Sequence, residues 1–253
     1  MRAGKAALAV ATITPLTLLM LGTVSIQETA PAVARADAPE RRAAPRPHIV
    51  SRPEWGADDE AVRERRPPYA HGVRAVFIHH TNHPNEYDCD NVPGMLRALQ
   101  ADHIQRGWDD VGYNFIVDRC GTIYEGRRGA MGHAVKGAHT KGFNTHSLGI
   151  AALGTFDEGV KVPKAMLKSI AAVTAWKLRP GINPRGRTKM TSTSDESRYP
   201  RGDKAKFNVI SGHRDAYDTD CPGKALYKKL PLLRKMVANA VRHHSHGKAG
   251  KHI

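Results

Sequence analysis

Runs of apolar residues mark the strands of this chain. Arg74–His80 (RAVFIHH) is rich in β-forming residues and lies between turn-forming residues, so it predicts a buried strand that ends in two histidines. Ser147–Leu153 (SLGIAAL) and Phe207–Ile210 predict two further strands. Tyr113–Asp118 and Thr122–Glu125 flank a short turn and predict a hairpin.

Three other segments follow the period of an α-helix. The apolar positions of Val92–Arg106 recur at helical spacing. A second helix is predicted from Pro163, a residue favoured at a first helical position, to a stop at Pro180. A third is predicted over Leu226–Val241, with a break at Pro231. Strands that alternate with helices predict an α/β layered domain.

The N-terminal 36 residues carry the pattern of an export signal. Arg2 and Lys5 precede a charge-free apolar run, and small residues at Ala34 and Ala36 form a site of the kind that signal peptidase cuts. We therefore predict a signal peptide over residues 1–36. An uncleaved anchor is the alternative, because about 20 apolar residues can span a bilayer.

Composition divides the rest of the chain into three parts. Residues 37–48 are rich in Ala, Pro and Arg and predict an extended linker. Residues 242–253 are polar, basic and rich in His, and predict a frayed tail. One domain over residues 49–241 is the simplest remaining division.

The chain is strongly basic, with a formal charge of +15 over 253 residues. Removal of residues 1–36 takes away three basic residues and one acidic residue, which leaves +13. Acidic partners such as anionic wall polymers are expected. A nucleic-acid binder is a competing interpretation, but basic and aromatic residues do not alternate along the chain, so we expect no nucleic acid partner. We also expect a monomer, with no membrane span after signal removal.

Two histidines and a cysteine lie where segments distant in sequence can converge. His79 and His213 follow or end predicted strands, and Cys221 comes eight positions after His213. Two imidazoles and a thiolate suit Zn²⁺ and leave a fourth position open for water, as in a catalytic site. Spacing alone leaves other interpretations open, because a single strand-end histidine is often a satisfied polar residue and a single cysteine is often part of a core or a disulfide.

Four ordered motifs resemble a known family. They are FIHHT (77–81), GWDDVGYNFIVDRCGTIYEGR (107–127), GAHTKGFNTHSLGIA (137–151) and GHRDAYDTDCPG (212–223). Together they resemble the zinc-dependent N-acetylmuramoyl-L-alanine amidases and peptidoglycan recognition proteins. The resemblance implies a single α/β domain, with a central mixed β-sheet flanked by helices and a substrate groove over one face.

The resemblance also implies roles for particular residues. His79, His213 and Cys221 match the zinc ligands, and Tyr113 of GYNF matches the catalytic tyrosine. Thr219 stands where phage lysozyme-like members carry a lysine, as in many recognition-protein amidases, and is expected to supply a weaker hydrogen bond to the oxyanion.

A further set of residues matches positions that contact substrate in the family. These are His80, Thr81, His103, Trp108, Arg127, His139 and Asn144. Trp108 and Arg127 resemble the residues of members that read meso-diaminopimelate, where a guanidinium binds the extra carboxylate. Other interpretations remain: His103 lies on the apolar stripe of its helix, Tyr113 can be a half-buried strand residue, and Arg127 can be a solvated hairpin residue.

The resulting prediction is a secreted zinc amidase that cleaves between N-acetylmuramic acid and L-alanine, with a non-catalytic peptidoglycan-binding protein as the alternative. With Cys221 assigned to zinc, Cys89 and Cys120 remain, and we infer a disulfide between them. The bias toward Ala, Arg, Gly and Pro indicates a GC-rich bacterial genome, and hence a protein that is secreted by, or associated with the wall of, a bacterium.

Overall fold

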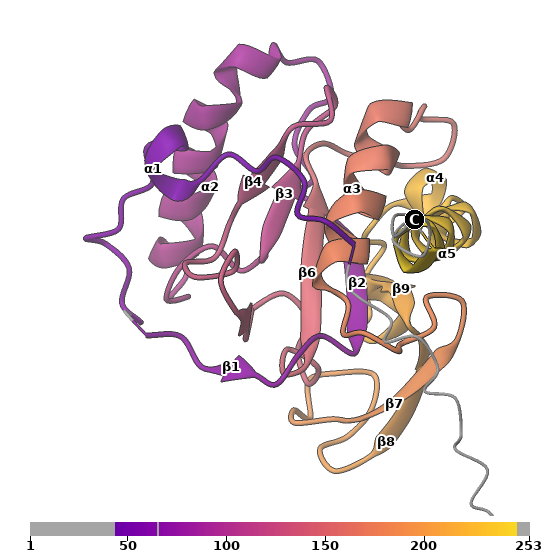
Figure 1. Cartoon of the computed structure of the whole chain (residues 1–253). Helices are drawn as coiled ribbons and strands as arrows, with labels where there is room; N and C mark the ends of the chain where they lie inside the picture. The colour runs from indigo at the N-terminus through magenta and orange to yellow at the C-terminus, as the bar shows by residue number, and fades with distance from the viewer. Residues whose placement is uncertain (1–43, 65, 247–253) are drawn as a thin grey trace, which may run out of the picture. The chain divides into compact units, whose positions relative to one another are not determined.

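The central feature is a five-stranded mixed sheet with the strand order β4-β3-β6-β2-β9. The computed structural model describes residues 44–64 and 66–246, with only the helical backbone for residues 243–246 (Figure 1). Strand β2 pairs in parallel with β6 and β9, β3 pairs in parallel with β6, and β4 runs antiparallel to β3. The strands of this sheet are β2 (Ala75–His80), β3 (Phe115–Val117), β4 (Ile123–Glu125), β6 (Ser147–Ala152) and β9 (Ile210–Gly212).

Helices and two small antiparallel strand pairs surround the sheet. One pair joins β1 (Tyr69–Ala70) to β5 (Ala134–Val135), and the other joins β7 (Arg187–Thr191) to β8 (Lys204–Asn208). The helices are α1 (Arg52–Trp55), α2 (Val92–Gln105), α3 (Lys164–Lys177), α4 (Lys224–Tyr227) and α5 (Leu230–His246), with 3₁₀ turns η1 (Cys89–Asn91) and η2 (His213–Asp215). The predicted fold class, a central mixed sheet flanked by helices in one domain, is confirmed.

Helix α1 and strands β1, β5 and β7 were not predicted, and two predicted elements are divided differently in the structure. The predicted strand Phe207–Ile210 is wrong as a single element, because β8 ends at Asn208 in one sheet and β9 begins at Ile210 in another. The C-terminal helical segment breaks before Pro231, between α4 and α5, and not at the proline itself. Pro231 lies in the first turn of α5, where a missing backbone N–H costs nothing.

The two faces of the sheet are covered differently. Residues Val76 and Ile78 of β2 and Leu148 and Ile150 of β6 belong to the apolar cluster that contains residues of α3 and α5; we call this the helix face. The residues that alternate with them point to the opposite face, which we call the site face. There Phe77 packs with residues of β8, while residues of β3 and β6 pack with α2. His79 lies on this face between the two coverings.

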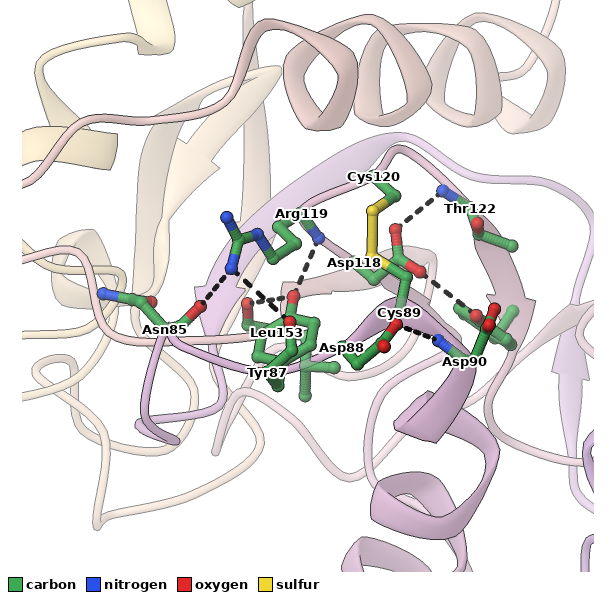
Figure 2. Close-up of a disulfide and its surroundings, with 11 residues drawn as sticks. Asn85, Tyr87, Asp88, Cys89, Asp90, Asp118, Arg119, Cys120, Thr122 and Leu153 are labelled. Carbon is green, nitrogen blue, oxygen red and sulfur yellow. Dashed lines mark hydrogen bonds between the residues drawn. A yellow bond between two sulfur atoms is a disulfide. The ribbon is translucent and has the colours of Figure 1, made fainter.

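A disulfide joins the η1 turn, which immediately precedes α2, to the hairpin of β3 and β4. Cys89 and Cys120 are bonded, as inferred from the sequence, and Figure 2 shows the polar contacts around them. The hydroxyl of Tyr87 donates to the Leu153 carbonyl and accepts from the backbone N–H of Arg119, at 3.2 and 2.7 Å. The crosslink therefore ties the loop before α2 to the edge of the sheet.

Described structure continues on both sides of residues 49–241, the predicted domain. Ala44, inside the predicted linker, is buried in the helix-face cluster, and α5 continues to His246, inside the predicted tail. The predicted signal at residues 1–36 lies outside the described residues. No helix in the described part of the chain combines the length and apolar character that a membrane span needs.

Candidate metal and catalytic site

Three segments distant in sequence bring His79, His213 and Cys221 together. His79 is the fifth residue of β2, His213 opens the η2 turn after β9, and Cys221 follows that turn. One ligand atom from each residue lies within 4.8 Å of the others. The Sγ of Cys221 is 3.7 Å from Nδ1 of His79, and it accepts from the backbone N–H of His80 at 3.4 Å. The three residues that spacing singled out therefore form one cluster.

The chemistry of this donor set fits a soft divalent metal such as zinc. Burial lowers the pKa of His79 well below its usual value and that of His213 to about 4, so both imidazoles are neutral at pH 7 and their ring nitrogens can act as ligands. Burial raises the pKa of the Cys221 thiol to about 12. A buried thiol becomes a thiolate at neutral pH when a cation binds beside it, so Cys221 could serve as a ligand together with the two neutral imidazoles.

A second layer of polar side chains holds His79. With Nδ1 of His79 toward the sulfur, its Nε2 lies 3.4 Å from Oγ1 of Thr140, which in turn lies 3.0 Å from Nδ1 of His139. Thr140 is fully buried and His139 is 5% exposed. Outer partners of this kind fix the tautomer and the ring orientation of a ligand histidine. Thr140 was not predicted, although it stands next to a predicted site residue in the GAHT motif.

His139 occupies space that two glycines leave open. A Cβ at Gly149 would lie 2.3 Å from the His139 ring, and one at Gly137 would lie 2.4 Å from it. Burial lowers the pKa of His139 to about 3. Its predicted role was substrate contact, but in the structure the ring is enclosed and reaches the ligand cluster through Thr140. The structure thus links His139 to His79 through Thr140, and the predicted contact of His139 with substrate stays a prediction.

Tyr113 and His103 lie beside the ligand cluster. The ring of Tyr113 is 5.2 Å from that of His79 and 5.6 Å from that of His103, measured between centroids. Burial raises the pKa of Tyr113, so its phenol stays protonated. His103 is 5% exposed, and its Nδ1 accepts from the backbone N–H of Gly112 at 3.2 Å. The Nδ1 atom of His103 is therefore occupied by a backbone contact, as the packing interpretation expects, and only its Nε2 side is left for a substrate.

Thr219, His80 and Thr81 lie in the loops next to the ligands. Oγ1 of Thr219 accepts from the backbone N–H of Cys221 at 3.2 Å, which leaves the hydroxyl proton free to donate elsewhere. The hydroxyl of Thr81 accepts from the backbone N–H of Gly154 at 3.0 Å. His80 is half-buried, and its Nδ1 has no hydrogen-bond partner within the described residues.

Two other residues predicted to contact substrate, Trp108 and Asn144, contact His103 and the His139 loop rather than the three clustered residues. The ring of Trp108 is 4.5 Å from that of His103, measured between centroids. Oδ1 of Asn144 accepts from the backbone N–H groups of His139 and Thr140, at 2.9 and 2.8 Å, so this amide shapes the loop that carries them.

Arg127 is not a solvated hairpin residue. Its side chain is 4% exposed and its guanidinium donates to the Val111 carbonyl at 3.2 Å and to Glu64 at 3.1 Å. A second carboxylate, that of Asp109, lies 3.9 Å away. Glu64 was not predicted as part of the site, because nothing in the local sequence links it to a residue 63 positions later.

Known proteins resemble this chain over most of its described length. The family model of N-acetylmuramoyl-L-alanine amidase matches residues 69–224. A peptidoglycan-recognition protein of Drosophila simulans is 33% identical over 183 residues, which is 72% of this chain and 85% of that protein. A peptidoglycan-recognition protein of Drosophila melanogaster is 37% identical over 121 residues, 48% of this chain and 63% of that protein.

Two further matches extend the comparison. N-acetylmuramoyl-L-alanine amidase of Sus scrofa is 32% identical over 187 residues, and the match spans 73% of this chain but only 27% of that protein. The solved structure of peptidoglycan recognition protein LE in complex with tracheal cytotoxin has a TM-score of 0.54 and 26% identity, and the match covers 73% of this chain and 92% of that one.

The organisms of these relatives correct one prediction. Curated relatives of this chain include proteins of insects and of mammals. They contradict the prediction of a bacterial protein, which rested only on composition. The family match itself covers well over half of the chain, in the segment that contains all three clustered ligands. The chain therefore belongs to the N-acetylmuramoyl-L-alanine amidase family, whose relatives here include the peptidoglycan recognition proteins.

Proposed function

We propose that the chain is a zinc-dependent amidase that hydrolyses the amide bond between N-acetylmuramic acid and L-alanine in peptidoglycan. The observation that carries this proposal is the cluster of His79, His213 and Cys221 within 4.8 Å. A buried thiol beside two neutral imidazoles suits a metal-dependent hydrolase better than a protein that only binds peptidoglycan. Membership of the amidase family supports the same reaction.

The residues around the cluster suit attack on a carbonyl. Bound zinc would act as a Lewis acid and would lower the pKa of its water to about 7. Tyr113 keeps its phenol proton because burial raises its pKa, so it can donate a hydrogen bond to the oxygen of the lactyl carbonyl as negative charge develops there. Thr219, whose oxygen already accepts from Cys221, can donate a second and weaker bond.

We further propose a preference for stems that contain meso-diaminopimelate. Arg127 is buried and has only partly exposed carboxylates beside it, so a carboxylate ligand can exchange with Glu64 or Asp109. Trp108 can supply a flat apolar wall next to the same stem residue. The recognition protein LE was solved with a ligand described as monomeric diaminopimelic acid-type peptidoglycan, which supports the same substrate class.

The reaction is tested by digestion of purified peptidoglycan with separate assays for new reducing ends and for new L-alanine amino termini. We expect free alanine amino groups and no new reducing ends. Reducing ends alone would identify a glycosidase. Binding without either product, in zinc-loaded protein, would identify the non-catalytic alternative.

The substrate preference is tested with matched synthetic muropeptides of the diaminopimelate and lysine types. A diaminopimelate stem offers its extra carboxylate to the buried guanidinium of Arg127 and a lysine-type stem has none to offer, so the gain of one charge-assisted contact predicts a roughly 5- to 150-fold preference in kcat/KM. Arg127→Ala should remove most of it through a loss on the diaminopimelate substrate alone. Arg128→Ala, which removes the same charge one residue later, is the control. Equal losses on both substrates in Arg127→Ala would show that Arg127 is not the discriminator.

A further inference from the structure

The β7–β8 hairpin carries a basic surface on its exposed side. Arg187 and Lys189 of β7 and Lys204 and Lys206 of β8 are all exposed and alternate with covered residues. The register places Lys189 directly opposite Lys206 and Thr191 opposite Lys204. We call the exposed side chains of these two strands the basic hairpin face. The ten residues of β7 and β8 together contain four positive charges and no acidic residue.

This arrangement costs stability unless something anionic binds to it. Like charges directly opposite each other on one face of a strand pair are destabilising. Over residues 44–64 and 66–242, where side chains are described, none of the four basic side chains forms an ion pair. Of the three acidic residues between the two strands, Asp195 pairs with Arg201 and Glu196 with Lys141. Asp203, next to Lys204, forms no ion pair within the described residues, so it offsets one of the four positive charges at that end of the strand.

The other side of the same hairpin packs against the candidate site. Ala205 and Phe207 lie in one cluster with Phe77, two residues before the ligand His79. The tip of the hairpin is joined to the loops that carry the other site residues, since the backbone N–H of Thr193 donates to Gly142 and that of Arg198 donates to Ala216. Figure 1 shows β7 and β8 as a separate layer beyond the start of β2. The basic hairpin face therefore belongs to an element that borders the site.

We propose that the basic hairpin face binds a linear polymer of repeated phosphate groups that is attached to peptidoglycan. This rests on the proposed function, because it names the material that surrounds the proposed substrate. Charges roughly 6 to 7 Å apart along each strand and about 5 Å apart across the pair suit a chain of regularly spaced anions better than a single anion. The face has no aromatic residue on which bases could stack and no apolar residue that could enter a bilayer, which disfavours nucleic acid and membranes.

Binding is measured first with linear polyphosphate as the probe, at several salt concentrations. The test variant is Lys189→Gln with Lys206→Gln. The control is Lys164→Gln with Lys168→Gln, which removes two exposed lysines from α3 and so changes the net charge equally. We expect about tenfold weaker binding in the test variant, with a dependence of log K on log salt that is shallower by about 2. The control pair should stay close to the parent protein.

The second measurement uses peptidoglycan before and after chemical removal of its phosphate polymers. The parent should sediment with the intact material more than with the stripped material, and the test variant should lose this difference. Equal effects of the two variant pairs would reduce the binding to net charge and overturn the proposal, as would tighter binding to single-stranded DNA or to anionic vesicles. Hydrolysis of a small soluble muropeptide should be unchanged in the test variant, so a failure here is separate from a failure of the proposed function.

Discussion

The two faces of the central sheet are built from the same strands but have different roles. On the helix face, β2 and β6 present Val76, Ile78, Leu148 and Ile150, all at most 1% exposed. Fully burying such a side chain stabilises the fold by about 1.5–3 kcal/mol. One face of the sheet therefore supplies much of the apolar burial that holds the domain together.

The site face carries less apolar volume, because a glycine and a histidine stand where the helix face has large apolar side chains. Between Leu148 and Ile150 stands Gly149, where a Cβ would collide with the ring of His139. Between Val76 and Ile78 stands Phe77, and the next residue on its face is the buried His79. Buried imidazoles cost stability unless they are hydrogen-bonded or bound to a metal. The comparison teaches that changes on the helix face should act on stability, whereas changes on the site face should act on metal binding and activity.

Replacement of the thiol on the site face should give the largest effect. Cys221→Ser exchanges a thiolate for a neutral hydroxyl, a far poorer zinc ligand. We expect zinc affinity to fall by more than the roughly 10- to 100-fold typical of an outer partner, and amidase activity to be lost with it. Metal analysis and the rate of L-alanine release measure both. Undiminished zinc and rate would remove Cys221 from the site.

The converse change on the helix face is Ile150→Ala, next to Gly149 in β6. Loss of this fully buried side chain should lower the free energy of unfolding by about 2–5 kcal/mol. Zinc affinity and kcat of the folded fraction should stay within about twofold of the parent. Denaturant unfolding gives the first quantity and chelator competition the second. A large drop in zinc affinity with little change in stability would show that the two faces are not separable in this way.

Acid should lower the free energy of unfolding through the buried histidines of the site face, whereas the apolar side chains of the helix face do not titrate. Burial lowers the pKa of His103 to about 4 and that of His139 to about 3. The unfolded chain takes up protons near pH 6.5 and the folded protein does not, so the unfolded state binds more protons and stability falls as the pH drops below 6.5. Each of these histidines should contribute up to about 1.4 kcal/mol per pH unit.

The measurement is denaturant unfolding of metal-free protein at pH 7.5, 6.5 and 5.5, above the range in which carboxylates titrate. Each buried histidine should lower the free energy of unfolding by about 0.4 kcal/mol between the first two values, because its imidazole is already half protonated in the unfolded chain at pH 6.5, and by about 1 kcal/mol between the last two. His133→Gln, at an exposed position, serves as the control and should leave the profile unchanged. A flat profile down to pH 5.5 would mean that the buried histidines are protonated in the folded state.

Features that depend on local pattern were predictable from the sequence. The apolar period and short motifs predicted strand β2 and helix α2, and also that His79, His213 and Cys221 come together. The β7–β8 pair was missed because RTKMT and KAKFN carry no continuous apolar run. The change of sheet at Val209 was missed for a related reason. The run from Phe207 to Ile210 is largely apolar and looks like one strand, although β8 and β9 belong to different sheets.

Long-range polar contacts were not predictable at all. Glu64 pairs with Arg127 and Thr140 with His79 only because folding brings their segments together. Residues of these types are common on protein surfaces, so the sequence around them does not indicate which residue they contact. His139 illustrates the intermediate case, since its motif marked it as a site residue but gave no sign that its ring would be enclosed beside Gly137 and Gly149.

The smallest effect should come from the hydroxyl that links His79 to His139. Thr140→Val keeps the shape of a fully buried side chain but removes the oxygen that lies 3.4 Å from Nε2 of His79 and 3.0 Å from Nδ1 of His139. If this oxygen fixes the orientation and tautomer of His79, zinc affinity should fall by about 10- to 100-fold. Thr140→Ser restores the hydroxyl and should recover most of the affinity, which a purely steric role of the methyl group would not allow. Chelator competition at pH 7.5 measures the affinities, and unfolding of the metal-free variants reports any general loss of stability. Equal zinc affinities in Thr140→Val and the parent would show that the contacts of Thr140 do not support the metal site, and that His79 is held by its place in β2 alone.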